Sequence, residues 1–119
     1  MIDPRELRIG NLVQDVFGIG EVSCIPNKDL VSLLKDGNIF YRMSEEVNPI
    51  PITEEWLRRL GFVNRDSNVW YRDWIYVLLY DSGLTFVCGS RHVDFFYVHQ
   101  LQNLYFALTG EELTLNQKV

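Results

Sequence analysis

The chain has 119 residues, of which 47% are hydrophobic and 13% aromatic, and it carries a formal net charge of −5 with a pI near 4.9. This apolar content is typical of a folded chain, and the length fits one compact domain or two small subdomains that share a core. The acidic balance argues against nucleic acid and against an anionic membrane as partners, because both attract basic surfaces.

Cysteine usage and the first residues indicate the cellular compartment. Cys24 and Cys88 are far apart, and no CxxC pair or metal-ligand spacing is present. The N-terminal residues include acids and lack the apolar run of a signal peptide, and no stretch of about 18 apolar residues could span a membrane. We therefore expect a cytoplasmic protein with free thiols and no cofactor.

The first part of the chain has the pattern of short strands joined by tight turns. Residues 7–15 lead into a predicted strand, the polar–apolar alternation at 21–25 predicts another, and further strands are predicted at 30–35 and 39–43. Glycine-containing turns are predicted at 17–20 and 36–38. Two prolines at 49–52 confine the next extended segment to a sheet edge. Residues 1–52 are thus predicted to form a small SH3-like β-barrel or an open meander.

The remaining residues, 53–119, predict a second α+β subdomain. Thr53 caps a helix over 53–61 that starts with acids, ends with arginines and stops at Gly61. Strands at 68–71, 74–80, 84–88 and 91–95 would form an antiparallel sheet. A helix over 98–109, stopped by Gly110, is predicted to pack on that sheet and to touch the first half, which gives one cooperative α+β unit.

Three segments resemble a known family. The run YVHQLQNLYFALTGEEL at 97–113, together with 6–13 and 49–57, resembles small bacterial proteins that have no assigned activity and are often carried by prophages or other mobile elements. The resemblance implies an origin in such an element and implies no activity or cofactor. Residues 10–13 and 17–22 are also similar to the opening of SH3-like barrels, including Tudor-like modules that bind RNA polymerase.

Aromatic residues of the second predicted sheet are the favoured binding residues. Large rings occur on both faces of these strands, and a small core cannot hide all of them. Such rings and arginine dominate protein interfaces, although core packing is the plain alternative. The predicted interface residues are Trp70, Tyr71, Arg72, Trp74 and Tyr76.

Two other kinds of site are weaker alternatives. A small enzyme could use a thiol–imidazole pair or a metal in the region that contains Cys88, His92, Asp94 and His99. Nucleic-acid binding would require the scattered arginines to cluster. These are Arg58, Arg59, Arg65, Arg72 and Arg91.

The absence of a catalytic signature and the surplus of aromatic residues favour one function. We expect a non-catalytic protein-interaction module that binds a protein partner or a second copy of itself. The resemblance above implies that it originates from a phage or another mobile element. A small enzyme is the second hypothesis and a nucleic-acid-associated protein is the third.

Overall fold

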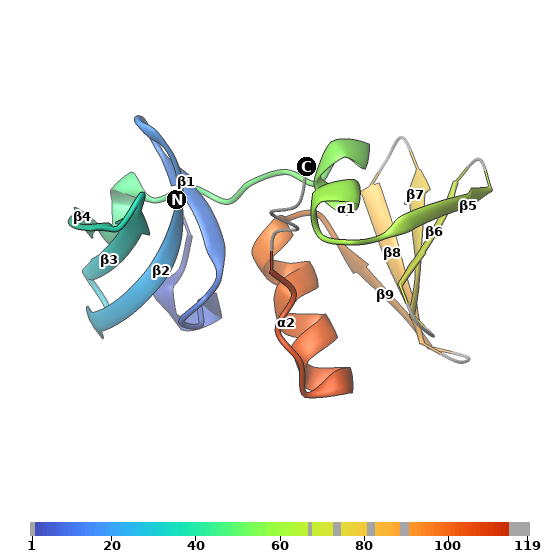
Figure 1. Ribbon diagram of the computed structural model, residues 1–119. Coiled ribbons are helices and arrows are strands. Elements are labelled where there is room, and N and C mark those ends of the chain that lie inside the picture. Colours follow the sequence, from blue (N-terminus) through green and yellow to red (C-terminus); the bar gives the residue numbers. More distant parts are fainter. Residues whose placement is uncertain (1, 67, 73–74, 81–82, 89–90, 115–119) are drawn as a thin grey trace. The chain divides into compact units, whose positions relative to one another are not determined.

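The computed structural model describes residues 2–66, 68–72, 75–80, 83–88 and 91–114 (Figure 1). The predicted α+β class is confirmed, since the described elements include two antiparallel sheets and two α-helices. The chain divides into a first unit, residues 1–50 and 97–112, and a second unit, residues 51–96 and 113–119. This division differs from the predicted 1–52 and 53–119 because the last helix returns to the first unit.

The first unit is built on a four-stranded antiparallel meander in the order β1-β2-β3-β4. Its elements are η1 (Pro4–Glu6), β1 (Leu12–Asp15), β2 (Gly18–Asn27), β3 (Leu30–Lys35), β4 (Asn38–Met43), η2 (Ser44–Glu46) and α2 (Val98–Thr109). Within these described strands β4 does not pair with β1, so the sheet is an open meander. After η2 the chain returns to the outer edge of β1, where Gln14 and Asn48 exchange two backbone hydrogen bonds of 3.0 and 2.8 Å.

Local turn chemistry sets the register of this meander. Asp36 and Gly37 connect β3 to β4 with φ angles of 49° and 81°. Positive φ at both central residues is the type I′ geometry, which suits the right-handed twist of a two-residue hairpin. Alternate residues of the strands then point into one core. That core contains Ile2, Leu7, Val13, Val22, Val31, Leu33 and Val47.

Polar side chains attach α2 to the first unit. Gln102 accepts the Leu12 N–H at 2.8 Å and donates to the Gly10 carbonyl at 3.2 Å. Arg8 donates to Asn103 and to Glu112, each at 2.8 Å. These contacts confirm the prediction that this helix touches the first half of the chain. Its packing on the second sheet stays a prediction.

The second unit contains a five-stranded antiparallel meander and a short helix. Its elements are α1 (Glu54–Arg59), β5 (Val63–Asp66), β6 (Val69–Arg72), β7 (Ile75–Tyr80), β8 (Gly83–Cys88) and β9 (Arg91–Phe95), with the strands in chain order. The predicted cap is present: the Thr53 hydroxyl accepts the Trp56 N–H at 3.4 Å. Gly61 ends the helix with a φ of 88°, a conformation that favours glycine. Neither described helix is long and apolar enough to cross a membrane.

Replacing Leu33 tests the core of the first unit. Leu33 is fully buried, so Leu33→Ala leaves a cavity and should lower the free energy of unfolding by about 3 kcal/mol. The neighbouring Leu34 is only partly buried, and Leu34→Ala should cost clearly less. Urea denaturation of both variants measures the difference, and equal losses would contradict this core.

His99 is a buried polar residue in the contact between α2 and η1. Its side chain is 1% exposed, and its Nε2 lies 3.2 Å from Oε1 of Glu6. Its Nδ1 has no hydrogen-bond partner among the described residues, and the Tyr97 ring stacks on the imidazole at 6.0 Å. Burial lowers the pKa of His99 below its ordinary value of 6.5, although Glu6 partly offsets this effect. The folded protein therefore holds a neutral imidazole at pH 7.

This burial predicts a stability that falls in mild acid. Below pH 6.5 the unfolded chain binds a proton at His99 more readily than the folded chain, so the free energy of unfolding declines until the pH reaches the lower native pKa. His99→Gln removes the group that binds this proton, so the free energy of unfolding of the variant should decline less steeply between about pH 7 and 5. Urea unfolding across that range measures both proteins. Parallel curves would be incompatible with a depressed His99 pKa.

Candidate functional site

The structure separates the predicted aromatic interface into core and partly exposed residues. Trp70 is 1% exposed and belongs to the core of the second unit, so its ring is unavailable to a partner there. Tyr71 and Tyr76 are half-buried, with ring centroids 6.3 Å apart. Arg72 donates to the Leu60 carbonyl at 2.7 Å, and Trp74 lies outside the described residues. For Tyr71 and Tyr76 the interface stays a prediction.

The residues of the predicted enzyme site are distributed over both units. Asp94 is exposed on β9 of the second unit, whereas His99 is buried in the first unit. The ladder pairs Cys88 with Arg91 and Val87 with His92, and the side chains at positions 88 and 92 lie outside the described part of the chain. Across the described residues, no group of three His, Cys, Asp or Glu side chains could hold a metal ion. An enzyme based on this region stays a prediction.

Four of the five arginines named for nucleic-acid binding make contacts within the second unit, and the side chain of Arg91 lies outside the described part of the chain. Arg58 lies over the Trp70 ring and Arg59 over the Trp56 ring, at 5.2 and 4.5 Å from the centroids. Arg65 donates to the Tyr76 hydroxyl at 3.1 Å. The second unit has six acidic and six basic residues, so it is neutral overall. These contacts and this balance do not favour a phosphate-binding surface.

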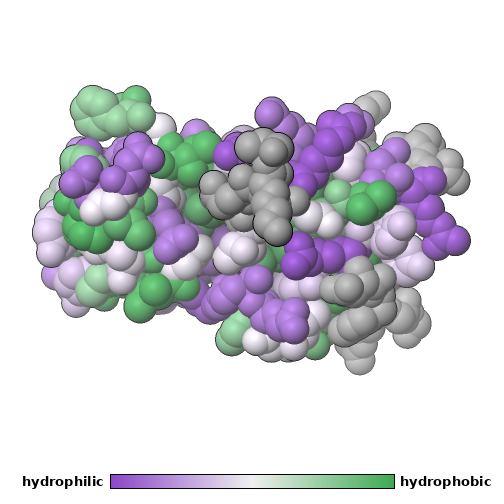
Figure 2. All heavy atoms as spheres, viewed as in Figure 1, coloured by the Kyte–Doolittle hydropathy of each residue, from purple (hydrophilic) through white to green (hydrophobic). Residues whose placement is uncertain are grey.

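A different surface, on the first unit, exposes several large apolar side chains. We call it the Phe17–β4 surface and define it by Val16, Phe17, Ile39, Phe40, Tyr41 and Met43. Val16 is 88% exposed and Phe17 is 79% exposed, both in the turn between β1 and β2, and Tyr41 on β4 is 64% exposed. Figure 2 shows hydrophobic side chains above this turn and beside β4. Sequence reasoning missed the surface because it treated 17–20 only as a turn and 39–43 only as a strand.

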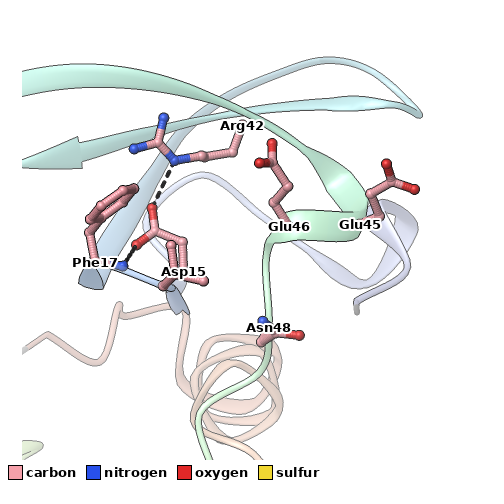
Figure 3. A pocket seen from close by; sticks show the side chains of 7 residues that line it. Asp15, Phe17, Arg42, Glu45, Glu46 and Asn48 are labelled. Atoms are coloured by element: carbon pink, nitrogen blue, oxygen red, sulfur yellow. Dashed lines mark hydrogen bonds and ion pairs between the residues drawn. The ribbon is translucent and has the colours of Figure 1, made fainter.

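A pocket of about 330 Å³ lies beside this surface (Figure 3). The β1–β2 turn forms one wall, Arg42 of β4 forms another, and η2 contributes two carboxylates. The lining residues are Asp15, Val16, Phe17, Arg42, Glu45, Glu46 and Asn48. Glu45 and Glu46 are exposed, and Oε1 of Glu46 accepts the Met43 N–H at 2.8 Å.

Asp15 fixes the geometry of the pocket. Its side chain is 1% exposed, and its two oxygens accept from Lys35 Nζ at 2.5 Å and from Arg42 Nε at 3.0 Å. Oδ1 also accepts the Phe17 N–H at 2.8 Å, which shapes the turn. Burial alone would raise the pKa of Asp15, but these donors outweigh it and hold the pKa below the ordinary value of 3.8.

Arg42 joins the turn and the strand into one surface. In addition to its bond with Asp15, its Nη1 donates to the Tyr41 carbonyl at 3.0 Å. Its guanidinium lies 5.5 Å from the Phe17 ring centroid and 5.4 Å from that of Phe40. Figure 3 shows the Phe17 ring beside this guanidinium. The arrangement therefore presents aromatic faces and carboxylates next to each other, which suits contact with a protein segment.

Comparison of the chain with protein-family models, with curated proteins and with solved structures finds no match. The functional argument accordingly depends on the geometry of this surface.

Asp15→Asn tests the ion pairs at the base of the pocket. The amide oxygen can still accept the Phe17 N–H, but Lys35 and Arg42 lose a buried counter-charge, so the free energy of unfolding should fall by about 3 kcal/mol at pH 7. Because the native pKa of Asp15 is lowered, its stabilising effect is complete above pH 3.8 and is lost in stronger acid. The difference between wild type and variant should therefore shrink below pH 3.8. Denaturation curves at several pH values measure it, and a difference that is independent of pH would contradict the ion pairs.

Proposed function

We propose that this protein is a non-catalytic interaction module that binds another protein through the Phe17–β4 surface. The single observation behind the proposal is the exposure of large apolar side chains on two neighbouring elements of the first unit, led by Val16 and Phe17. Large exposed apolar side chains beside a pocket on a small protein are characteristic of a site where another molecule binds. This location replaces Trp70 and its neighbours as the favoured interface.

The local chemistry supports a specific contact and not non-specific hydrophobic association. The turn that presents Phe17 is held by the buried Asp15 carboxylate, so the ring is offered on a fixed backbone. A preorganised turn loses little conformational entropy on binding. The pocket beside it provides a concave volume in which a partner side chain could be desolvated, as at the centre of many interfaces.

A peptide display library supplies a partner with which to test the proposal. Peptides selected on the wild-type protein should lose at least about tenfold in affinity for Phe17→Ser, because a buried aromatic contact is worth more than about 1.4 kcal/mol. Fluorescence anisotropy with labelled peptides measures the dissociation constants. Circular dichroism of the variant confirms that the fold is retained.

Ile9→Ser is the matched control. Ile9 is also in the first unit and is as exposed as Tyr41, at 64%, but it lies outside the Phe17–β4 surface. The selected peptides should bind Ile9→Ser as they bind wild type. Selection of peptides that bind Phe17→Ser and wild type equally would refute the proposed surface.

A further inference from the structure

The hairpin register shows which backbone groups of β4 face away from the sheet. The type I′ turn closes with the pair Lys35–Asn38, and the ladder continues with Leu33–Phe40 and Val31–Arg42. In an antiparallel ladder closed by a two-residue turn, these are the pairs that exchange hydrogen bonds. The N–H and C=O groups of Ile39, Tyr41 and Met43 therefore point to the outer edge.

Two of these outward groups already have partners, and these contacts confirm their direction. Arg42 Nη1 donates to the Tyr41 carbonyl, and Glu46 accepts the Met43 N–H. Both outward groups of Ile39 and the N–H of Tyr41 have no partner among the contacts of the described chain. The opposite edge of the sheet differs, because Asn48 pairs with Gln14 on β1.

The side chains of β4 do not protect this edge. Proteins usually block exposed edges with proline, an outward lysine or a bulge. The β4 sequence is Asn-Ile-Phe-Tyr-Arg-Met, its pairing with β3 is regular, and its one cation is directed to the buried Asp15. Ile39 and Tyr41 are 49% and 64% exposed beside the open groups. An added strand would find hydrogen-bonding partners and apolar side chains together.

Charge identifies the kind of segment that could be added. The first unit contains ten acidic and five basic residues and so carries the whole net charge of −5. Glu46 lies at the end of the open edge, because it accepts the outward N–H of Met43, and Glu45 precedes it. A second copy would bring the same negative charge to this edge, whereas a basic segment would be attracted.

We propose that a positively charged, extended segment of a partner protein binds the first unit by adding a strand to the β4 edge at Ile39–Tyr41, with its cationic end at Glu45 and Glu46. The inference rests on the proposed function and names the partner's chemistry and its mode of binding. The short open edge suits a reversible contact.

Two short synthetic peptides of alternating valine and threonine serve as probes. One has lysines at both ends, and the other has the same sequence with glutamates in place of the lysines. The lysine peptide should bind at least about tenfold more tightly, and its binding should weaken as salt is added. Hydrogen exchange at the Ile39 and Tyr41 amides should slow in its complex. Equal binding of the two peptides would overturn the charge assignment, and unchanged exchange at both amides would overturn strand addition.

Two variants separate the backbone contribution from the charge contribution. Ile39→Pro removes an outward N–H without breaking the ladder with β3, so it should bind the lysine peptide about fivefold to tenfold more weakly than Ile39→Thr, which has the same backbone donor as wild type. Glu46→Gln retains an acceptor for the Met43 N–H but loses the charge, and it should weaken binding severalfold. Circular dichroism checks the fold of the proline variant, and Glu46→Gln gives an independent test.

The outcomes distinguish this inference from the proposed function. Suppose that the display peptides depend on Phe17 but are neutral or acidic, and that they bind Ile39→Pro as tightly as Ile39→Thr. This result would overturn strand addition by a basic segment, and it would leave the proposed Phe17–β4 surface in place. A wild-type protein that sediments as a dimer, and an Ile39→Pro variant that sediments as a monomer, would assign the edge to a second copy and overturn the proposed partner.

Discussion

The ion pairs of Asp15 with Lys35 and Arg42 are the constraint on which the geometry of the Phe17–β4 surface depends. One nearly inaccessible carboxylate, at the end of β1, holds a cation from β3 and a cation from β4. The same carboxylate holds the backbone of the Phe17 turn. Desolvating these charges is costly, and such a cluster is stable only when its geometry satisfies the carboxylate fully. That requirement fixes the turn, and with it the position of the Phe17 ring.

The position of Arg42 also bears on why large apolar side chains of this small unit stay exposed and are not packed into its core. The Arg42 guanidinium lies between the Phe17 and Phe40 rings and is itself held by Asp15 and by the Tyr41 carbonyl. A charged group at this place contacts both rings, so the two aromatic side chains flank a cation and not an apolar core. The core beneath is closed by aliphatic residues such as Val31 and Leu33, while the Phe17 and Phe40 rings stay exposed.

Local patterns in the sequence were sufficient to predict most helices and strands. They were not sufficient to predict which distant residues contact each other. The Asp36-Gly37 turn with its flanking strands and the Thr53 cap are encoded within a few residues, so their predicted positions agree closely with the structure. The strand β5 was not predicted, and β2 begins at Gly18, inside the predicted turn. The place of α2 depends on Gln102, which binds residues about ninety positions away, and no local signal records that partner. The surface at Phe17 was missed for a related reason. The geometry of its turn depends on the ion pairs of Asp15 with two cations that are distant in the sequence. Without knowledge of those ion pairs, the sequence does not distinguish Phe17 from an aromatic residue in any other turn.

The return of α2 makes the first unit discontinuous, with residues 51–96 of the second unit inserted between residues 50 and 97. The chain leaves the first unit after Ile50 and returns to it near Val98, and these two residues are hydrogen-bonded, with the Val98 N–H donating to the Ile50 carbonyl at 2.9 Å. In the second unit the Ile52 N–H likewise donates to the Phe96 carbonyl at 3.1 Å. During synthesis the meander of β1 to β4 must emerge more than fifty residues before the helix that satisfies its Leu12 backbone. The strands β5 to β9 are made in that interval, so the first unit can be completed only after them.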